Sequence, residues 1–309
     1  MERMTLNGIY KLKYFDYDTF HIENVMCDNF FPNDWIDANV PEDVHTTLRR
    51  YGYLSGHYYD KDLDQERWID EKDWVYFRSF VADERLYGHA CTLCLEGVDT
   101  LARVWLNGTL LGTCQNMFRE YTFPVGDALL FGQENRLVIQ VLSPLGHTAS
   151  TSKKGIYPED DATRMLLRKS QMNWGWDFCG HCLTVGLWKS IYLKTCDEAA
   201  LSDARLTTET LDAKEAKLHL SCTVQNGSAE DEVEIKLSAK GVPVCIHRLT
   251  ADEARDFSFT LKEPRPWWPR PYGDPFLYDV CIQLLHGGAT VDKKEFHFGL
   301  RIVELQQNY

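Results

Sequence analysis

The amino-acid sequence predicts an all-β protein with two domains. Three observations support this prediction: apolar and polar residues alternate in many short runs, turn signals separate these runs, and helical periodicity is scarce. Alternation with a period of two is typical of antiparallel strands that bury one face of a sheet. The length of 309 residues suits two domains, because one domain usually has about 100–200 residues.

The first two thirds of the chain, residues 1–198, are expected to form the first domain. Strands are expected over residues 75–81, 90–95, 101–106, 136–142 and 187–193. Asn107 and Gly108 predict a two-residue hairpin turn between two of these strands. A short helix is expected to begin at Pro41 and to continue through Leu48. Proline suits the first helical turn, and the two acidic residues that follow it favour the positive end of the helix dipole.

The last third of the chain, residues 199–309, alternates more regularly. At least five runs carry apolar residues at every second position, as in Leu218, Leu220 and Cys222. Turns that contain glycine separate the runs at the spacing typical of an immunoglobulin-like β-sandwich, which is the fold expected here. The boundary between the domains is expected in the polar stretch 196–202.

Composition and charge exclude several classes of partner. The chain has 33 basic and 46 acidic residues, for a net charge of −13, without a basic run. This balance argues against binding to nucleic acid or to an anionic membrane. No apolar run approaches the ~20 residues of a membrane span, and the N-terminus lacks the apolar core of a signal peptide. With ten cysteines, typical of a reducing compartment, a cytoplasmic location is expected.

Two Cys-x-x-Cys pairs raise the possibility of a zinc or redox site. Cys91 and Cys94 lie in an expected strand, where positions i and i+3 face opposite sides and cannot bind one ion without a bulge. Cys179 and Cys182 match a disulfide-isomerase sequence, but the surrounding segment lacks the βαβ frame of a thioredoxin fold. No metal and no cofactor are therefore expected. Motifs of nucleophilic serine hydrolases, zinc proteases and phosphate-binding loops are absent from the sequence.

One segment has the composition of a carbohydrate site. Trp174, Trp176 and Phe178 surround Asp177 in a loop with Gly175, shortly before an expected strand. An aromatic ring covers the apolar face of a sugar, and a carboxylate accepts hydrogen bonds from its hydroxyl groups. The alternative interpretation is a structural loop in which both tryptophans fill the core and Asp177 acts as a cap.

Four stretches resemble the N-terminal part of glycoside hydrolase family 2, most closely its β-mannosidases. The stretches are Val40 to Leu48; Asp99-Thr100 with the strand and turn up to Arg119; Arg168-Lys169-x-Gln171 with Gly175-Trp176-Asp177 and Thr184-Val185-Gly186; and Trp267-Trp268-Pro269 with Phe298 to Arg301. The resemblance implies a jelly-roll, galactose-binding-like β-sandwich before the immunoglobulin-like sandwich. It also implies that Trp176 and Asp177 contact the substrate.

The resemblance implies a function for the whole parent protein. That function is retaining hydrolysis of terminal β-D-mannose residues by two glutamates, ~5–5.5 Å apart, in a (β/α)8 barrel. The barrel is expected after residue 309, so this chain is expected to hold no catalytic residue. The expected partners are a β-mannoside or related glycan and that barrel. Another family 2 exo-glycosidase, such as a β-glucosaminidase, and a stand-alone carbohydrate-binding or scaffold module are the alternatives.

The sequence departs from the family pattern within the aromatic loop. Phe178, Cys179, Gly180 and His181 stand where the family has Trp, Gly, Pro and Arg. The loop thereby loses a rigid proline and one permanent cation, which bears on the choice of sugar.

Overall fold

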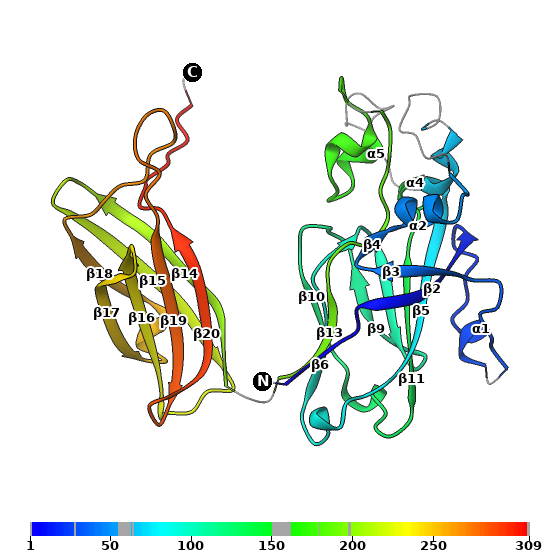
Figure 1. Ribbon diagram of the computed structural model, residues 1–309, viewed down its shortest axis with the longest axis horizontal. Coiled ribbons are helices and arrows are strands. Elements are labelled where there is room, and N and C mark those ends of the chain that lie inside the picture. The colour runs from blue at the N-terminus through cyan, green and yellow to red at the C-terminus, as the bar shows by residue number, and fades with distance from the viewer. Residues whose placement is uncertain are drawn as a thin grey trace. The chain divides into compact units, whose positions relative to one another are not determined.

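A computed structural model describes residues 2–27, 29–54, 63, 65–149, 162–178, 180–196 and 199–307. The chain divides into two compact units, residues 2–195 and residues 196–309 (Figure 1). Strands dominate both units, and the strand pairs between named strands are antiparallel. The predicted all-β class is therefore confirmed.

The first unit is a β-sandwich. Its larger sheets run in the orders β3-β2-β5-β11-β8-β9 and β1-β13-β6-β10. Tyr10 and Trp74 from the first sheet share a buried core with Leu93 and Leu193 from the second. The strands are β1 (Arg3–Thr5), β2 (Gly8–Asp16), β3 (Ile36–Val40), β5 (Lys72–Val81), β6 (Cys91–Leu95), β8 (Ala102–Leu106), β9 (Thr109–Cys114), β10 (Tyr121–Pro124), β11 (Glu134–Val141) and β13 (Ile191–Thr195). The predicted Asn107-Gly108 turn joins β8 to β9, a strand that was not among those expected from the sequence.

Strand β5 is buried on both faces, which explains its nearly continuous apolar sequence. Trp74 and Tyr76 point into the main core, whereas Val75 and Phe77 belong to a second cluster. This second cluster is covered by the segment around α1 (Glu23–Met26), which contributes aromatic residues such as Trp35.

A third, smaller sheet of the first unit has the order β4-β12-β7, with β4 (Glu42–Asp43), β7 (Val98–Asp99) and β12 (Gly186–Leu187). The single strand expected over 187–193 is wrong, because the chain leaves β12 after Leu187 and enters another sheet as β13. Between the two strands, Trp188 N donates to the main-chain oxygen of Gly97 at 3.2 Å, and the Trp188 ring lies against Gly97.

Few helices are present in the described parts of the first unit. The helix expected from Pro41 begins later, as α2 (Val44–Arg50), because Asp43 is its N-cap and accepts a hydrogen bond from Thr46 N at 3.0 Å. The remaining helical segments are α4 (Pro144–Ala149), α5 (Ala162–Met165) and the 3-10 helices η1 (Arg67–Glu71), η2 (Glu84–Leu86), η3 (Gly126–Ala128) and η5 (Gln171–Trp174).

The second unit is a sandwich of the sheets β14-β15-β18 and β17-β16-β19-β20. The alternating residues predicted to face inward do so: Leu218, Leu220 and Cys222 pack with Ile235 and Ile282 in one core. Its elements are β14 (Ala200–Leu211), β15 (Glu215–Gln225), β16 (Asp231–Ala239), β17 (Val242–Thr250), η6 (Glu253–Arg255), β18 (Phe257–Lys262), β19 (Tyr278–His286) and β20 (Ala289–Phe298).

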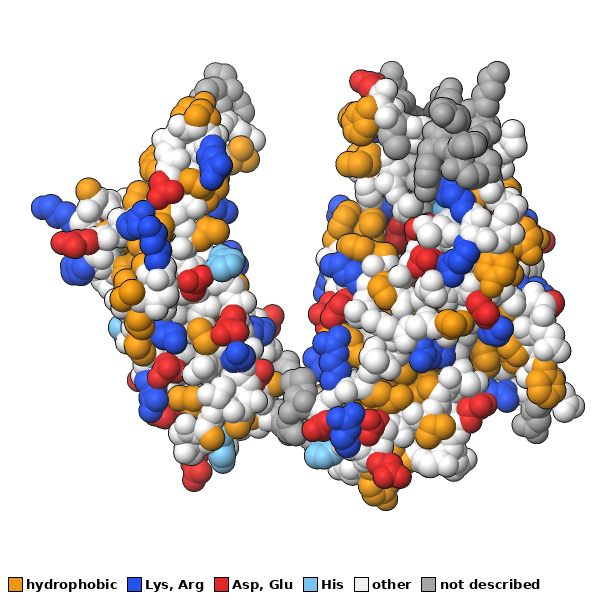
Figure 2. Space-filling view, viewed as in Figure 1, with side chains coloured by type: hydrophobic (Ala, Val, Ile, Leu, Met, Phe, Trp, Pro, Cys, Tyr) orange, Lys and Arg blue, Asp and Glu red, His pale blue; other side chains and the backbone are white. Residues whose placement is uncertain are grey.

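The described residues include no helix with the length and apolar character needed to cross a membrane. On the face drawn in Figure 2, acidic and basic side chains are interspersed over each unit.

Candidate functional site

Three segments that are distant in the sequence meet in the small β4-β12-β7 sheet. Gly186 of β12 pairs with Asp43 of β4 on one side and with Asp99 of β7 on the other. Gly186 has φ +147, and a Cβ atom there would lie 2.9 Å from the main-chain oxygen of Glu42 and 2.9 Å from the Tyr76 hydroxyl. A glycine is required for this close approach. The small sheet therefore brings together motifs that are far apart in the sequence.

A buried ion pair anchors the segment that leads to the aromatic loop. Lys169 Nζ lies 2.6 Å from both carboxylate oxygens of Asp99, and the two side chains are 1% and 4% exposed. The Thr184 hydroxyl donates to Asp99 Oδ2 at 2.8 Å, and Lys169 donates to the Thr184 main-chain oxygen. Burial lowers the pKa of Lys169, whereas the charge of Asp99 opposes this shift. The ion pair thus joins β7 to both ends of the loop.

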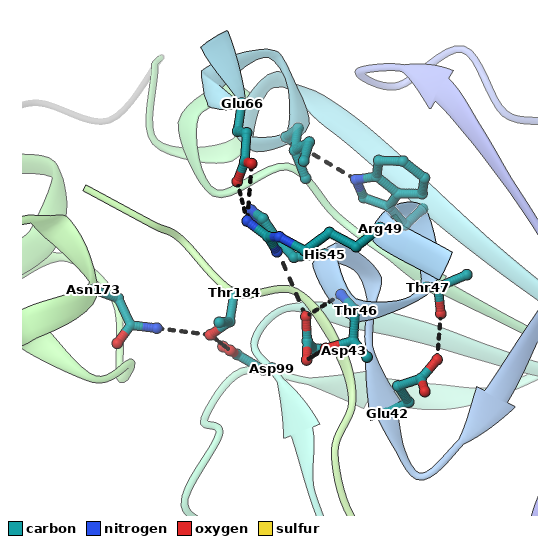
Figure 3. A network of polar contacts seen from close by, with 12 residues as sticks. Glu42, Asp43, His45, Thr46, Thr47, Arg49, Glu66, Asp99, Asn173 and Thr184 are labelled. Carbon is teal, nitrogen blue, oxygen red and sulfur yellow. Dashed lines mark hydrogen bonds and ion pairs between the residues drawn. The ribbon is translucent and has the colours of Figure 1, made fainter. Parts of the chain in front are cut away.

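Further hydrogen bonds close the loop at its base. Asn173 Nδ2 donates to Thr184 Oγ1 at 2.7 Å, and Thr184 in turn bonds Asp99 (Figure 3). The main-chain N–H of Cys182 donates to the main-chain oxygen of Asn173 at 2.9 Å. Gly175 follows with φ +101, a conformation that side chains disfavour. The chain consequently turns outward directly before Trp176.

The two predicted sugar-binding residues project from this loop. Trp176 is 53% exposed, and Asp177 is also exposed. Asp177 has no side-chain hydrogen bond or ion pair to any residue that the structure describes. Trp174 differs, because it packs partly buried against Leu101 and Leu142. An indole face and an unengaged carboxylate are therefore presented together at the surface.

A second contact connects the loop to η1. His181 Nε2 lies 2.6 Å from Asp70 Oδ2, and His181 Nδ1 lies 3.3 Å from the main-chain oxygen of Trp174. The Trp174 ring also contacts the imidazole edge to face, with centroids 6.2 Å apart. Burial raises the pKa of Asp70, and the hydrogen bond from His181 opposes this shift. A cavity of about 420 Å³ adjoins this contact, and Arg67, Asp70, Trp174 and His181 are among its lining residues.

Helix α2 contributes to a third set of polar contacts beside the small sheet (Figure 3). Arg49 Nη2 contacts the two carboxylate oxygens of Glu66 at 2.8 and 2.6 Å, and Thr47 donates to Glu42 at 2.7 Å. His45 is buried, and this burial lowers its pKa to about 4. Since Arg49 bonds Glu66 and Thr47 bonds Glu42, these side chains form part of the scaffold.

The cysteine pairs lie apart from this site or only partly within the described residues. Cys91 belongs to the main core of the first unit, whereas Cys94 lies outside that cluster, in agreement with opposite faces of β6. Burial raises the pKa of Cys94 and that of Cys182 to about 11. Cys179, the other half of the second pair, lies outside the described residues. Among those residues, no group of three or more His, Cys, Asp or Glu side chains could hold a metal ion.

The fold and the gathered motifs define a class, the β-sandwich domains of glycoside hydrolases. A family model described as "Glycosyl hydrolase 2 galactose-binding domain-like" matches residues 20–189, and one described as "Glycosyl hydrolases family 2" matches residues 199–301. The chain therefore belongs to glycosyl hydrolase family 2, and the predicted family and order of the two sandwich types are confirmed.

Curated relatives carry the name Beta-mannosidase B. One from Aspergillus terreus is 31% identical over 284 residues, which cover 87% of this chain and 33% of that protein. One from Thermothelomyces thermophilus is 30% identical over 280 residues, which cover 87% of this chain and 32% of that protein. The chain thus spans about a third of the length of these relatives.

Solved structures agree with this assignment. A crystal structure of a Beta-D-Mannosidase from Dictyoglomus thermophilum has 30% sequence identity and a TM-score of 0.81, and the match covers 99% of this chain and 37% of that chain. A Bifidobacterium dentium beta-glucuronidase matches with 22% identity and a TM-score of 0.66, covering 99% of this chain and 49% of that chain. The second match shows a shared fold alone.

Sequence reasoning does not identify the anchors of the loop. Asp99, Lys169 and Thr184 belong to the family-like motifs, but their mutual contacts are not predicted by those motifs. His181 stands out in the sequence only as a replacement for arginine, and Asp70 belongs to none of the motifs. One signal in the sequence could have pointed to these anchors, namely ionisable residues inside otherwise apolar or motif-bearing segments. Such residues are seldom buried without a partner, so each of them predicts a contact with another polar residue.

Proposed function

We propose that this chain forms the N-terminal domains of a β-mannosidase-like retaining exo-glycosidase that removes terminal β-D-mannose residues. In this proposal, Trp176 and Asp177 form part of the pocket for the non-reducing-end sugar. The sandwich domains also act as a scaffold. Catalysis belongs to two glutamates outside this chain, in a (β/α)8 barrel expected after residue 309.

The observation that carries the proposal is that Trp176 and Asp177 are neighbouring exposed residues on a loop with an anchored base. The indole is 53% exposed, and the carboxylate is not engaged by the described residues. A rigid base lowers the entropy lost when the loop binds a ligand. An indole face and a hydrogen-bond-accepting carboxylate suit the apolar face and the hydroxyl groups of a pyranose. The names of the relatives favour mannose as that sugar.

Two alternatives differ in measurable ways. Another family 2 exo-glycosidase, such as a β-glucosaminidase, would use the same loop to bind a different sugar. The replacements at Phe178 and His181 lie in this loop and therefore bear on which sugar it binds. A stand-alone carbohydrate-binding or scaffold module would bind a sugar without turnover.

A substrate panel tests the proposal. The complete gene product would be assayed with aryl β-mannoside, β-N-acetylglucosaminide, β-glucuronide and β-galactoside. The proposal predicts the highest kcat/KM for the mannoside. Preference for another sugar would transfer the assignment to that glycosidase, and sugar binding without turnover by the complete product would favour the binding module.

The proposed location is the cytoplasm. It is supported by ten cysteines in the sequence, and the nine that the structure describes form no disulfide with one another. Fractionation of cells that express the complete gene product would test it, because recovery in a secreted fraction would contradict it.

A further inference from the structure

We propose that His181 is a positioning residue whose protonation holds the loop bearing Trp176 and Asp177 in place, so that this loop is ordered in mild acid and loosens as the pH rises. That the loop contacts a sugar rests on the proposed function. The positioning itself depends only on contacts within this chain.

The two ring nitrogens of His181 both face oxygen atoms. Nε2 lies 2.6 Å from the Asp70 carboxylate, and Nδ1 lies 3.3 Å from the main-chain oxygen of Trp174. A carboxylate and a carbonyl oxygen are acceptors, and a neutral imidazole has only one N–H to donate. The imidazolium can donate to both acceptors at once, whereas a neutral ring beside a carboxylate must leave one nitrogen lone pair facing an oxygen.

The same conclusion holds whether the proton lies on His181 or on Asp70. Asp70 is buried, its side chain being only 2% exposed, while His181 is 18% exposed. If the proton sits on Asp70, the carboxyl group donates to Nε2 and Nδ1–H donates to Trp174. Both arrangements contain one proton more than a carboxylate beside a neutral imidazole, so the pair titrates as a unit. Loss of that proton removes one of the two contacts.

Other charged groups lie near this pair. Arg67 and Glu71 of η1 and Arg164 of α5 line the adjoining cavity. Lys169 acts electrostatically on Asp70 from the base of the loop. The Cys182 thiol stays protonated near neutral pH, because burial raises its pKa to about 11.

These contacts flank the two exposed residues. Trp174 and His181 lie on either side of Trp176 and Asp177 in the sequence, and their mutual contact closes the loop above its base. The remaining closure, from Asn173 to Thr184 and from Cys182 to Asn173, uses amide, hydroxyl and main-chain groups that do not titrate. A change of pH thus acts on the contact of His181 and leaves these two hydrogen bonds of the base intact.

Nuclear magnetic resonance of the 309-residue chain tests the proposal directly. Histidine ring nitrogens labelled with ¹⁵N report the protonation of His181, and the indole N–H of Trp176 reports the motion of the loop by its heteronuclear Overhauser effect. Spectra are recorded from about pH 5 to 8, the range in which imidazoles usually titrate. We expect the Trp176 signal to gain fast motion with the same midpoint at which the His181 pair loses its proton.

Three variants separate positioning from general stability. His181→Arg keeps a permanent cation, and the motion of Trp176 should then be independent of pH. His181→Gln should show high mobility at every pH. His286→Gln is the matched control, because His286 also lies 2.7 Å from a buried aspartate, Asp231, but in the second unit. This control should retain the pH profile of the wild type.

Two results would overturn the proposal: titration of His181 without any change at Trp176, or an identical pH profile in His181→Arg. Failure of the proposed function is distinguishable from these. If the loop orders as described but methyl β-D-mannoside leaves the signals of Trp176 and Asp177 unchanged in the complete protein, the positioning stands and the sugar assignment fails. If both hold, the affinity for the mannoside should fall about tenfold or more as the pair loses its proton, as expected from loss of one charge-assisted hydrogen bond.

Discussion

Lys169 and Asp99 are 70 residues apart in the sequence, yet Lys169 Nζ contacts both carboxylate oxygens of Asp99 at 2.6 Å. Both side chains are buried, and the Thr184 hydroxyl completes the coordination of the carboxylate. This contact fixes the start and the end of the loop that carries Trp176 and Asp177. The proposed sugar contact therefore depends on a base built from strand β7 and from both flanks of the loop.

Removal of one partner of this ion pair should destabilise the first unit strongly. Lys169→Met leaves the Asp99 carboxylate buried without its cation, a change that usually costs about 3–5 kcal/mol. Urea unfolding at neutral pH measures the difference. Lys217→Met is the control, because its pair with Glu209 is exposed and should be worth less than about 1 kcal/mol. Similar small losses in both variants would show that the buried pair is not an anchor.

Gly186→Ala should disrupt the small sheet. The new Cβ would lie 2.9 Å from two oxygen atoms, in a backbone conformation with φ +147. Overpacking and backbone strain each cost roughly 1–3 kcal/mol. Gly132→Ala offers a comparison, since Gly132 also has positive φ but a methyl group there would meet no atom within 4 Å. Equal losses of unfolding free energy in the two variants would argue against a close approach at Gly186.

The stability of the first unit should fall in acid because of His45. Burial lowers the pKa of His45 to about 4, below the value of about 6.5 expected in the unfolded chain. Between these values the unfolded chain binds a proton that the folded chain does not, so stability decreases as the pH falls from about 6.5 to 4. At 1.36 kcal/mol per pKa unit, the loss is roughly 3 kcal/mol.

Urea unfolding at several pH values, in the wild type and in His45→Gln, tests this prediction. The variant lacks the titrating group, so its stability should depend less steeply on pH in this range. Parallel curves for the two proteins would mean that His45 takes up its proton equally in the folded and unfolded states.

The cysteines should react slowly in the native chain and completely after unfolding. Burial raises the pKa of Cys94 and Cys182 to about 11 and that of Cys114 to about 12, which disfavours the reactive thiolate. Exposed Cys27 should react first with a thiol reagent. A denatured sample should yield a count close to ten, the number of cysteines in the sequence. Bound stoichiometric zinc, or a disulfide between Cys179 and Cys182 that persists in mild reductant, would contradict this prediction.

The 309-residue chain on its own should not hydrolyse aryl β-mannosides. Retaining hydrolysis needs two carboxylates about 5–5.5 Å apart across the scissile bond, and the proposal assigns both to a domain outside this chain. The rate of aryl release would be compared with a buffer blank. Turnover above the blank that disappears when one acidic residue of this chain is replaced would refute the assignment.

Local patterns in the sequence predict the sandwich strands well, because period-two alternation reflects a side chain's position on a half-buried sheet. Leu218, Leu220 and Cys222 face the core as expected. The pattern is less informative where a strand changes sheets. Leu187 and Ile191 look like one strand, because apolar periodicity carries no information on the contact of Trp188 with Gly97 that separates β12 from β13.

The composition of the loop points to Trp176 and Asp177, but not to what supports them. The contacts of Lys169 with Asp99 and of His181 with Asp70 span 70 and 111 residues. Such contacts depend on the path of the whole chain, so no local spacing predicts them. The predicted start of α2 is also wrong, because acidic residues suit both a first helical turn and an N-cap, and Asp43 takes the second position.

The central claim, that Asp177 binds the sugar, is tested most directly by the kinetics of Asp177→Ala in the complete, barrel-containing protein. A carboxylate that accepts a hydroxyl hydrogen bond contributes about 1.5–3 kcal/mol. At about 1.4 kcal/mol per decade, kcat/KM for an aryl β-mannoside should fall roughly 10- to 100-fold or more, with little change in Tm. Asp127→Ala, which replaces another exposed aspartate of the first unit, should leave kcat/KM unchanged. If Asp177→Ala stays within about twofold of the wild type, well below the effect of one such hydrogen bond, the loop is structural and the proposed site is wrong.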